Sequence, residues 1–421
     1  MDNTTNIKKN TKTKETYAAT LARRVSQTCR VFKVKVQSNK LNATQRETLK
    51  MLFVEAKWMY NNILALSRQD GSDVFSLKYT ELGTVTHYDK DGNELQSELT
   101  CLSSQMKQGV LEGFCQNIKN LAKAKRKGLK VGALKFLNEY KAINLKQADV
   151  SYRILSKNRV KVQGIKKPLQ VNGLKQFMYL PDYELANAKL MMENGDYYIA
   201  FTVYTPREDN PSKPLIGCDM GCKTCVTLSN GEKYDFKVEE SEQVKRLQRK
   251  LNRQQNGSNN RWKTQLKLRK IKARDARRKD DEANKIVHDI TEHYTVVMQD
   301  EQVAEWAETN GNTVSKGIIG RVKERLLLKP DTVVLNKWLP TTKLCTCCGH
   351  RVELTLRDRT FVCPECGCKA DRDIHAAGNM LWFYRNNIGV GRTELTPVEI
   401  DSSVSKVFSL KQEAAESLVQ R

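Results

Sequence analysis

The chain has 421 residues and a formal net charge of +24, with 72 Lys and Arg residues against 48 Asp and Glu. This length exceeds what one hydrophobic core usually serves, so we expect at least two domains. No apolar run approaches the length of a membrane-spanning helix, and no secretory signal peptide is evident. The basic excess favours nucleic acid as a partner, because Lys and Arg bind by neutralising phosphates. A solvated basic surface or a patch for anionic membranes is the alternative.

The pattern of the first half predicts strands that are interrupted by helices. The first ~15 residues are polar and predicted to be disordered. Residues 29–36 alternate like a half-buried strand. A helix then begins near Thr44, a candidate N-cap that forms a capping box with Glu47, and a second helix covers 103–129. Residues 150–205 return to short strands, so we expect a β-barrel-like module with a helical insertion.

The second half carries a long basic stretch. Residues 241–285 have a helical pattern, and the polar segment 256–260 divides them into two predicted antiparallel helices. A charge run is often only a solvated face, but charge of nearly one sign repels itself and favours a polyanion nearby. The residues expected to contact nucleic acid are Lys267, Arg269, Lys270 and Lys272 here, and Lys123, Lys125, Arg126 and Lys127 at the end of the earlier helix.

The remaining elements alternate between helix and strand. A helix at 283–293 is followed by a strand at 294–301 and a glycine-bearing loop. A helix at 316–329 and a strand at 331–338 then lead to a cysteine-rich segment.

Two Cys-x-x-Cys pairs dominate that segment, Cys345 with Cys348 and Cys363 with Cys366. Tetrahedral zinc takes four soft ligands, and two such pairs separated by a short polar hairpin are typical of a zinc ribbon. A four-cysteine set is characteristic of a closed structural site, since catalytic zinc keeps one position open. We therefore expect Zn²⁺ to shape this region without taking part in chemistry.

The other cysteines suggest no disulfide framework. Cys347 and Cys368 lie inside the ribbon as spare thiols. Cys218, Cys222 and Cys225 are either a second metal site or small buried strand residues, and free cysteine is common in the latter role.

Acidic residues recur where apolar strands end or a helix begins. Asp219 follows one strand, the triplet 299–301 (Gln-Asp-Glu) follows another, and Asp373 opens the helix after the ribbon. Hard cations take carboxylate oxygens, and three acidic residues on separate elements can hold two Mg²⁺ ions ~3.5–4 Å apart for phosphodiester hydrolysis. The pattern predicts a magnesium-dependent phosphodiesterase.

These motifs resemble those of TnpB-type transposon nucleases. IGCDMGCKTCVTLSNGEKY is similar to their first RuvC motif, and CxxC…CxxC followed by ADRDIHAAGNM is similar to their zinc ribbon and third RuvC motif. The basic helical pair and the segments RVFKVKV, LFVEAKWMYNNIL and KRKGLKVGALKF also resemble the family, over roughly residues 25–385. Miniature type V CRISPR effectors share this plan.

The resemblance implies an α+β multidomain chain: a wedge-like β-barrel with a helical recognition insertion, then an RNase H-like (RuvC) α/β domain with an inserted zinc ribbon. The expected parts are a disordered tail 1–20, the barrel 21–44 and 132–212, the insertion 45–131, the nuclease 213–340 and 371–390, the ribbon 341–370 and a C-terminal tail 391–421.

Two positions depart from the family pattern. In the second motif Glu directly follows the strand, and Gln299, a poor magnesium ligand, stands there. Because side chains alternate along a strand, Glu301 shares the face of Gln299 and lies ~6–7 Å further along, while Asp300 points away. We therefore assign catalysis and magnesium binding to Asp219, Glu301 and Asp373, with Asp300 in reserve, and expect Gln299→Ala to retain much activity. His375 replaces the usual Asn of the third motif, either to contact the scissile phosphate or to pack the helix.

The resemblance implies a guide RNA, cleavage of double-stranded target DNA and a cytoplasmic protein, encoded by a bacterium or a phage and acting at the nucleoid. Gln299 motivates an alternative, a nuclease-deficient RNA-guided DNA-binding protein that represses transcription. A basic DNA-binding accessory factor of a transposase, without a guide, is a third reading.

Overall fold

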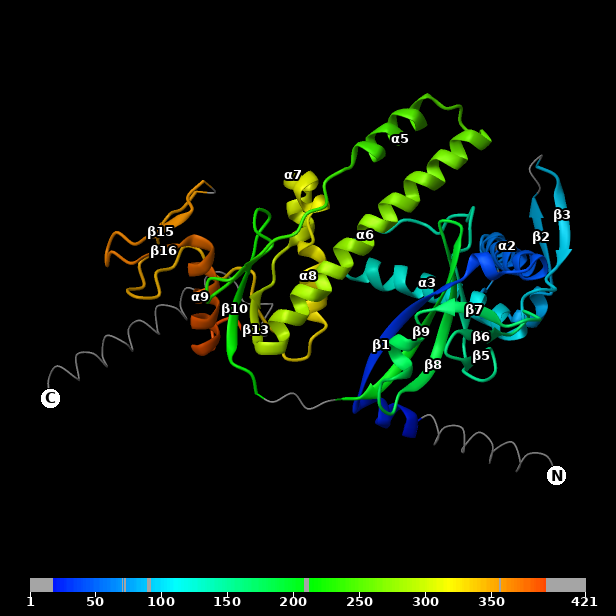
Figure 1. Ribbon diagram of the computed structural model, residues 1–421, viewed down its shortest axis with the longest axis horizontal. Helices are drawn as coiled ribbons and strands as arrows, with labels where there is room; N and C mark the ends of the chain where they lie inside the picture. The colour runs from blue at the N-terminus through cyan, green and yellow to red at the C-terminus, as the bar shows by residue number, and fades with distance from the viewer. Residues whose placement is uncertain are drawn as a thin grey trace. The chain divides into compact units, whose positions relative to one another are not determined.

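The computed structural model describes residues 18–69, 71, 73–88, 92–207, 212–355 and 357–390. The chain divides into two compact units, Met1–Asp209 and Asn210–Arg421 (Figure 1). Of the expected N-terminal tail, residues 18–20 belong to a helix that continues to residue 25, and the rest lies outside the described residues. The expected C-terminal tail also lies outside them. No helix in the described ranges is both long and apolar enough to cross a membrane.

The first unit is built on a seven-stranded antiparallel sheet of order β4-β8-β9-β1-β7-β6-β5. Tyr152, on the last strand, donates its hydroxyl to the carbonyl oxygen of Ala186 at 2.7 Å. Because Ala186 lies on β8, near the other end of the order, the sheet curls into a nearly closed barrel, which confirms the predicted barrel. The strands are β1 (Gln27–Val36), β4 (Ala142–Leu145), β5 (Tyr152–Ser156), β6 (Arg159–Val162), β7 (Leu169–Asn172), β8 (Glu184–Glu193) and β9 (Asp196–Pro206).

The two long helices of the first unit lie between β1 and β4 in the chain. The main ones are α2 (Ala43–Leu66) and α3 (Ser104–Arg126), with the hairpin β2 (Thr84–Tyr88) and β3 (Glu94–Glu98) between them. Short helical turns occur at η1 (Ser38–Lys40), η2 (Tyr79–Leu82) and α4 (Lys175–Met178).

The start of α2 corrects one expectation. The N-cap is Asn42, whose side chain accepts from the backbone N–H of Gln45 at 2.8 Å, while the Gln45 side chain accepts from the Asn42 N–H at 3.0 Å. This is a capping box two residues before the one predicted at Thr44 and Glu47. Gln45 is buried and also donates to the carbonyl oxygens of a neighbouring loop, whereas Glu47 is exposed.

The second unit contains a five-stranded mixed sheet of order β12-β11-β10-β13-β14. Its first three strands form an antiparallel meander, and β13 and β14 add in parallel on the other side of β10. This is the strand order of an RNase H-like sheet, as the RuvC resemblance implies. The strands are β10 (Leu215–Met220), β11 (Val226–Leu228), β12 (Lys233–Tyr234), β13 (Thr295–Gln299) and β14 (Val333–Leu335).

Both faces of this sheet are covered. Cys218 and Met298 belong to a core shared with α6 (Asn259–His293) and α8 (Ile319–Leu327). Alternate residues such as Val297 face the opposite way, into a core shared with α9 (Arg372–Arg385). The ribbon hairpin, β15 (Thr360–Val362) and β16 (Lys369–Asp371), directly precedes α9.

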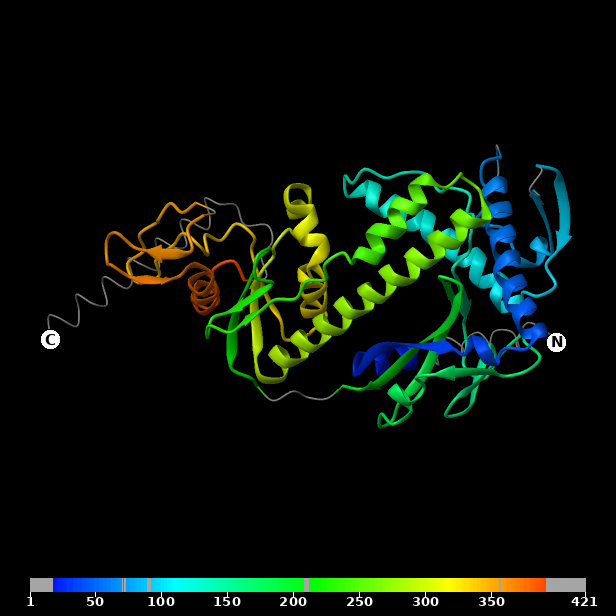
Figure 2. The same cartoon turned by 45° about the horizontal axis from the view of Figure 1, so that its top comes forward.

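Two helical predictions need correction. The basic pair is α5 (Glu242–Arg253) and α6, as expected, but α6 continues unbroken through residues 283–293. Figure 2 shows α5 beside the N-terminal part of this long helix. The expected glycine-bearing loop is instead α7 (Val303–Lys316), whose backbone leaves helical geometry only at Asn310. Glycine there lowers helix propensity without preventing a helix.

Candidate active site and metal centre

Asp219 is placed by an unusually close contact between β10 and α9. A Cβ atom on Gly217 would lie 1.8 Å from the carbonyl oxygen of Ala377, so only glycine lets the helix approach this closely. Asp219 lies two residues further along β10 and therefore on the same face. The first turn of α9 carries Asp373. The Gly217 contact thus brings these two carboxylates to one face of the sheet.

Asp300 and Glu301, which follow β13, have different surroundings. The carboxylate of Asp300 lies 2.8 Å from the Nζ of Lys323, on α8, which covers the other face of the sheet. The same Nζ donates to the backbone carbonyl of Glu301. Asp300 is thus already paired, whereas the Glu301 side chain forms no ion pair with another described residue and acts on the pKa of Asp219.

The pKa of Asp219 responds to the two other carboxyl groups. The pKa of Asp219 is raised well above its ordinary value by burial, then by the charges of Asp373 and Glu301, and Arg372 opposes the shift. Burial likewise raises the pKa of Glu301 to about 7, against the lowering effect of Lys323. A site that concentrates unfavourable negative charge in this way is suited to divalent cations.

The spacing of the three carboxylates bears on how many ions they suit. Among the described residues, Asp219, Glu301 and Asp373 do not form a group whose oxygens all lie within 4.8 Å of one another. This spread is compatible with two ions, about 3.5–4 Å apart, that each use some of the ligands.

Two basic residues at this site were missed at the sequence level. Lys323 comes from α8, a helix whose pattern gave no sign of it. Arg372 lies next to Asp373, with its Nε 3.4 Å from the carboxylate, and its adjacency to Asp373 in the chain could have revealed it.

Gln299 does not join the carboxylates. Its side chain is only 4% exposed and lies among backbone carbonyl groups of the segment that follows β14. His375 is half-buried, with its Nε2 2.9 Å from the carbonyl oxygen of Leu344, and burial lowers its pKa. Both side chains are therefore occupied by structural contacts.

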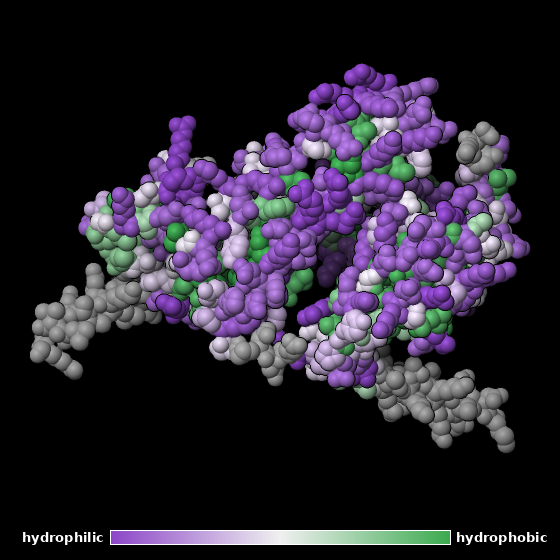
Figure 3. Space-filling model, in the orientation of Figure 1, coloured by the Kyte–Doolittle hydropathy of each residue, from purple (hydrophilic) through white to green (hydrophobic). Residues whose placement is uncertain are grey.

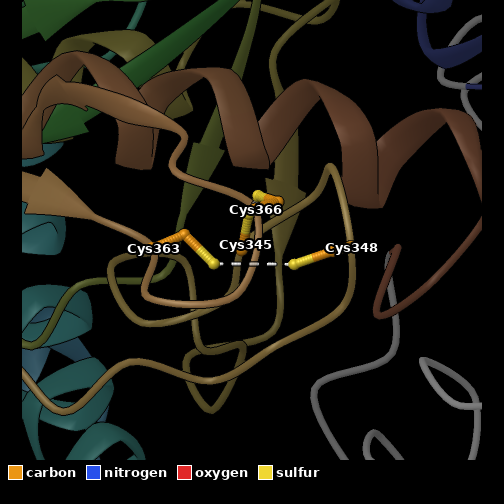
Figure 4. A group of neighbouring side chains, drawn as sticks. All are labelled: Cys345, Cys348, Cys363 and Cys366. Atoms are coloured by element: carbon orange, nitrogen blue, oxygen red, sulfur yellow. Dashed lines mark hydrogen bonds between the residues drawn. The ribbon is translucent and has the colours of Figure 1, made fainter.

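The four predicted ribbon cysteines converge, with their Sγ atoms all within 4.8 Å of one another (Figure 4). The Sγ atoms of Cys345 and Cys366 are 3.6 Å apart, and those of Cys348 and Cys363 are 3.5 Å apart. A zinc ion with Zn–S bonds of about 2.3 Å needs a tetrahedron with edges of about 3.8 Å, so the donor set fits zinc.

The spare thiols are closer to this cluster than expected. Cys347 and Cys368 form a second group with Cys345, again with all Sγ atoms within 4.8 Å. No such group among the described residues includes Cys218, Cys222 or Cys225. Cys218 and Cys225 are buried, but only Cys218 lies on a strand, because β11 begins at Val226.

The predicted nucleic-acid contacts are exposed. None of these eight side chains forms an ion pair with another described residue, and Figure 3 shows a largely hydrophilic surface over the α5–α6 hairpin. They are Lys267, Arg269, Lys270 and Lys272 on α6, and Lys123, Lys125, Arg126 and Lys127 at the end of α3. The hairpin is held by Arg261, whose guanidinium donates to the carbonyl oxygens of Leu251 and Gln254.

Two family models match parts of the chain, from β9 of the first unit into the second unit. Residues 198–305 match OrfB_IS605, described as a probable transposase, and residues 330–380 match the Cas12f1-like TNB domain. The second match contains all four clustered cysteines and Asp373.

Three curated relatives are 27–33% identical to parts of the chain. The chain is 33% identical over 178 residues to a "Putative RNA-guided DNA endonuclease" of Streptomyces pristinaespiralis, covering 39% of this chain and 44% of the relative. It is 27% identical over 225 residues to "Putative RNA-guided DNA endonuclease InsQ" of Escherichia coli strain K12, covering 46% and 56%. "Putative transposase A625R" of Paramecium bursaria Chlorella virus 1 is 27% identical over 209 residues, covering 44% and 47%. The chain thus matches about half the length of these relatives.

Solved structures of Cas12f complexes are similar over a larger share of the chain but with low scores. A Cas12f1–sgRNA–target DNA complex matches with a TM-score of 0.26 and 12% identity, covering 84% of this chain and 98% of that one. A CRISPR–Cas12f ternary complex gives 0.26 and 14%, covering 80% of both. The fold assignment rests on the strand topology described above. The two family models and the curated relatives thus show that the second half of the chain is similar to OrfB_IS605 proteins over residues 198–305 and to the Cas12f1-like TNB domain over residues 330–380.

Proposed function

We propose that the protein is an RNA-guided endonuclease that cleaves double-stranded DNA by magnesium-dependent phosphodiester hydrolysis at Asp219, Glu301 and Asp373. The observation that carries this proposal is the placement of Asp219 on β10, where the charges of Glu301, after β13, and of Asp373, at the start of α9, both raise its pKa. Two curated relatives that bear the name of putative RNA-guided DNA endonucleases support the substrate class.

The carboxylates would act as ligands of two Mg²⁺ ions. Bound there, the ions would supply an activated water and stabilise the leaving 3′ oxygen. The protein's part is to orient the carboxylates, and the pKa values of Asp219 and Glu301 are raised as long as no metal is bound. Binding therefore releases protons, and metal affinity should increase with pH.

The four cysteines would hold a structural zinc. The knuckles leave no open position for a substrate, so the zinc's contribution is to the folding of the segment before α9. Guide RNA and target DNA would use the exposed basic residues of α6 and α3, which lack protein partners in the described ranges. Such contacts position the nucleic acid, while base pairing with the guide reads the sequence.

Cleavage by the protein purified with its RNA tests this proposal. With Mg²⁺ and a matched target, wild type should cut, and Asp219→Ala and Asp373→Ala should bind the target without cutting it. Glu301→Ala should be as damaging as Asp219→Ala. If Glu301→Ala still cuts and Asp300→Ala does not, the third ligand is Asp300 and the assignment to Glu301 is wrong.

One observation favours a second function, guided binding without cleavage. Gln299 stands where the family places Glu, and its side chain does not face the carboxylates. A wild-type complex that binds a matched target but never cuts it would support this repressor. A protein that copurifies with no discrete RNA would favour the third reading, a basic DNA-binding factor without a guide.

A further inference from the structure

The side chain of Gln299 holds the segment that joins β14 to the first ribbon cysteine. Its Nε2 lies 3.1, 2.9 and 3.0 Å from the carbonyl oxygens of Asn336, Lys337 and Leu339. Its Oε1 accepts from the hydroxyl of Thr341 at 3.0 Å. The two N–H groups of the amide are thus shared among three carbonyl oxygens. A carboxylate at this position could only accept hydrogen bonds and would be repelled by these oxygens, so an amide is required.

Asn379 holds the same segment from α9. Its Nδ2 donates to the carbonyl oxygens of Thr341 at 2.7 Å and Leu344 at 2.8 Å. Its Oδ1 accepts from the hydroxyl of Thr346 at 3.1 Å. The side chain is 2% exposed, so these bonds replace all of its contact with water.

His375, one turn earlier on α9, joins α9 to the ribbon itself. Its ring stacks on Phe361 with the centroids 3.8 Å apart and the planes 16° from parallel. Its Nε2 lies 2.9 Å from the carbonyl oxygen of Leu344, to which the neutral ring can donate. Asn379 can then give both of its N–H groups to the carbonyls of Thr341 and Leu344.

We propose that Gln299, Thr341, Asn379 and His375 form a buried polar clamp that makes the cysteine cluster and the carboxylate site one mechanically coupled unit. Residues 336–346, here called the neck, carry the first cysteine of the cluster. The clamp fastens the neck to β13 two residues before Glu301, and to α9 two residues after Asp373. Its members are positioning residues, and neither Gln299 nor His375 contacts the reacting atoms. This proposal rests on the proposed function only for the identity of the carboxylate site.

The coupling has a direct physical route. The neck is bound on one side to the end of β13 and on the other to α9 by hydrogen bonds between buried groups, which are costly to break. If the neck moves, Glu301 and Asp373 move relative to Asp219. Mutation of residues that hold metal ligands in place typically lowers the metal affinity of a site about 10- to 100-fold.

Isosteric substitutions separate the hydrogen bonds from packing. Gln299→Glu keeps the shape but presents a carboxylate to three carbonyls, and Thr341→Val keeps the volume but removes the hydroxyl. Thr341→Ser restores the hydroxyl and is the rescue variant. Gln243→Glu makes the same chemical change at an exposed position of α5 and is the control for added charge.

Two measurements use the zinc-loaded protein without nucleic acid. Mn²⁺ titration followed by electron paramagnetic resonance reports the carboxylate site, and the rate of zinc transfer to a coloured chelator reports the cluster. We expect Gln299→Glu and Thr341→Val to weaken Mn²⁺ binding at least about tenfold and to release zinc several times faster. Thr341→Ser and Gln243→Glu should match wild type within about twofold in both assays. A purely structural defect would lower the fraction of binding-competent protein and leave the Mn²⁺ affinity of that fraction unchanged.

Several results would overturn the clamp. These are wild-type Mn²⁺ affinity in Gln299→Glu, failure of Thr341→Ser to restore what Thr341→Val loses, and a zinc release rate that no clamp variant alters. DNA cleavage by the double variant Gln299→Glu/Glu301→Ala would also overturn it, because Glu at 299 would then be serving as the ligand. If wild type itself binds no Mn²⁺, the proposed function fails, and the zinc release rates alone decide on the clamp.

Discussion

At the residue scale, the carboxyl group of Asp219 is both a proposed ligand and a source of instability. Its folded-state pKa is raised by burial and by Asp373 and Glu301. A raised pKa means that the folded state holds protons more tightly than the unfolded state does. The associated stability is present at low pH and is lost as pH rises through the folded-state pKa. For Glu301 that window runs from 4.5 to about 7.

Asp219→Asn should therefore stabilise the metal-free protein above neutral pH. We expect a gain of about 1–2 kcal/mol, or about 2–8 °C in melting temperature, at pH 8, and a smaller gain near pH 5. Thermal unfolding in a chelator of divalent cations other than zinc measures it. Mg²⁺ should raise the melting temperature of wild type and not of the variant. Exposed Asp331→Asn is the control, and a variant that melts below wild type at pH 8 would refute the electrostatic account.

The contacts of Gln299 change the effect that is expected of its substitution. Because Gln ligates magnesium poorly, the sequence predicts that Gln299→Ala leaves much activity. The side chain instead makes four buried hydrogen bonds, and its loss would strand three carbonyls and one hydroxyl. The variant should be damaging through the neck even though Gln299 is no ligand.

At the element scale, the distance between β10 and α9 is set by Gly217. Gly217→Ala would place a methyl group 1.8 Å from the carbonyl oxygen of Ala377. The helix must then move, which we expect to cost about 1–3 kcal/mol and to lower the cleavage rate about 100-fold by displacing Asp373 from Asp219. Denaturant unfolding and single-turnover cleavage measure the two effects.

The matched control lies on the same helix. A Cβ atom on Gly378 would meet nothing within 4 Å, and alanine favours a helix over glycine by about 1 kcal/mol. Gly378→Ala should therefore be neutral or stabilising. Equal losses in both variants would show that α9 tolerates no change and that the close approach at Gly217 is not special.

The ribbon also belongs to the element scale. Cys345→Ser or Cys363→Ser should abolish tight zinc binding, since removing one of four thiolates opens the tetrahedron and metal binding there is folding energy. Cys347→Ser and Cys368→Ser should keep the zinc, measured by metal analysis after dialysis. Equal zinc loss from all four variants would refute the ligand assignment. Zinc that is kept by Cys363→Ser but lost from the other three variants would mean that the metal uses the second thiol group.

At the scale of the whole molecule, the net charge of +24 predicts binding that weakens steeply with salt. Replacing Lys267, Arg269, Lys270 and Lys272 with Gln should lower the slope of log affinity against log salt by about 0.9 for each phosphate that the protein no longer neutralises. Lys285→Gln is the control on the same helix, because Lys285 already pairs with Asp281 at 2.8 Å. An unchanged slope in the fourfold variant would make the basic run a solvated surface.

The features that could be predicted from the sequence are those that depend on residues close together in the chain. The alternation of the barrel strands, the knuckles of the ribbon and the basic helical pair all depend on residues a few positions apart, and spacing alone was enough to predict them. Asp219 and Asp373 were predicted to be site residues because each stands at the end or start of an element. Local rules were less accurate at boundaries, where Asn42 took the cap expected at Thr44.

The roles of Gln299, His375 and Gly217 depend on contacts between segments that are far apart in the chain. The partners of Gln299 lie 37 to 42 positions away in the chain, and no local pattern shows that they converge on one amide. Gly217 needs to be glycine only because α9, more than 150 residues later, packs directly on it. Hydrogen bonds and close contacts between distant segments exist only once the topology has brought those segments together, and here they occupy the side chains of Gln299 and His375 with structural contacts.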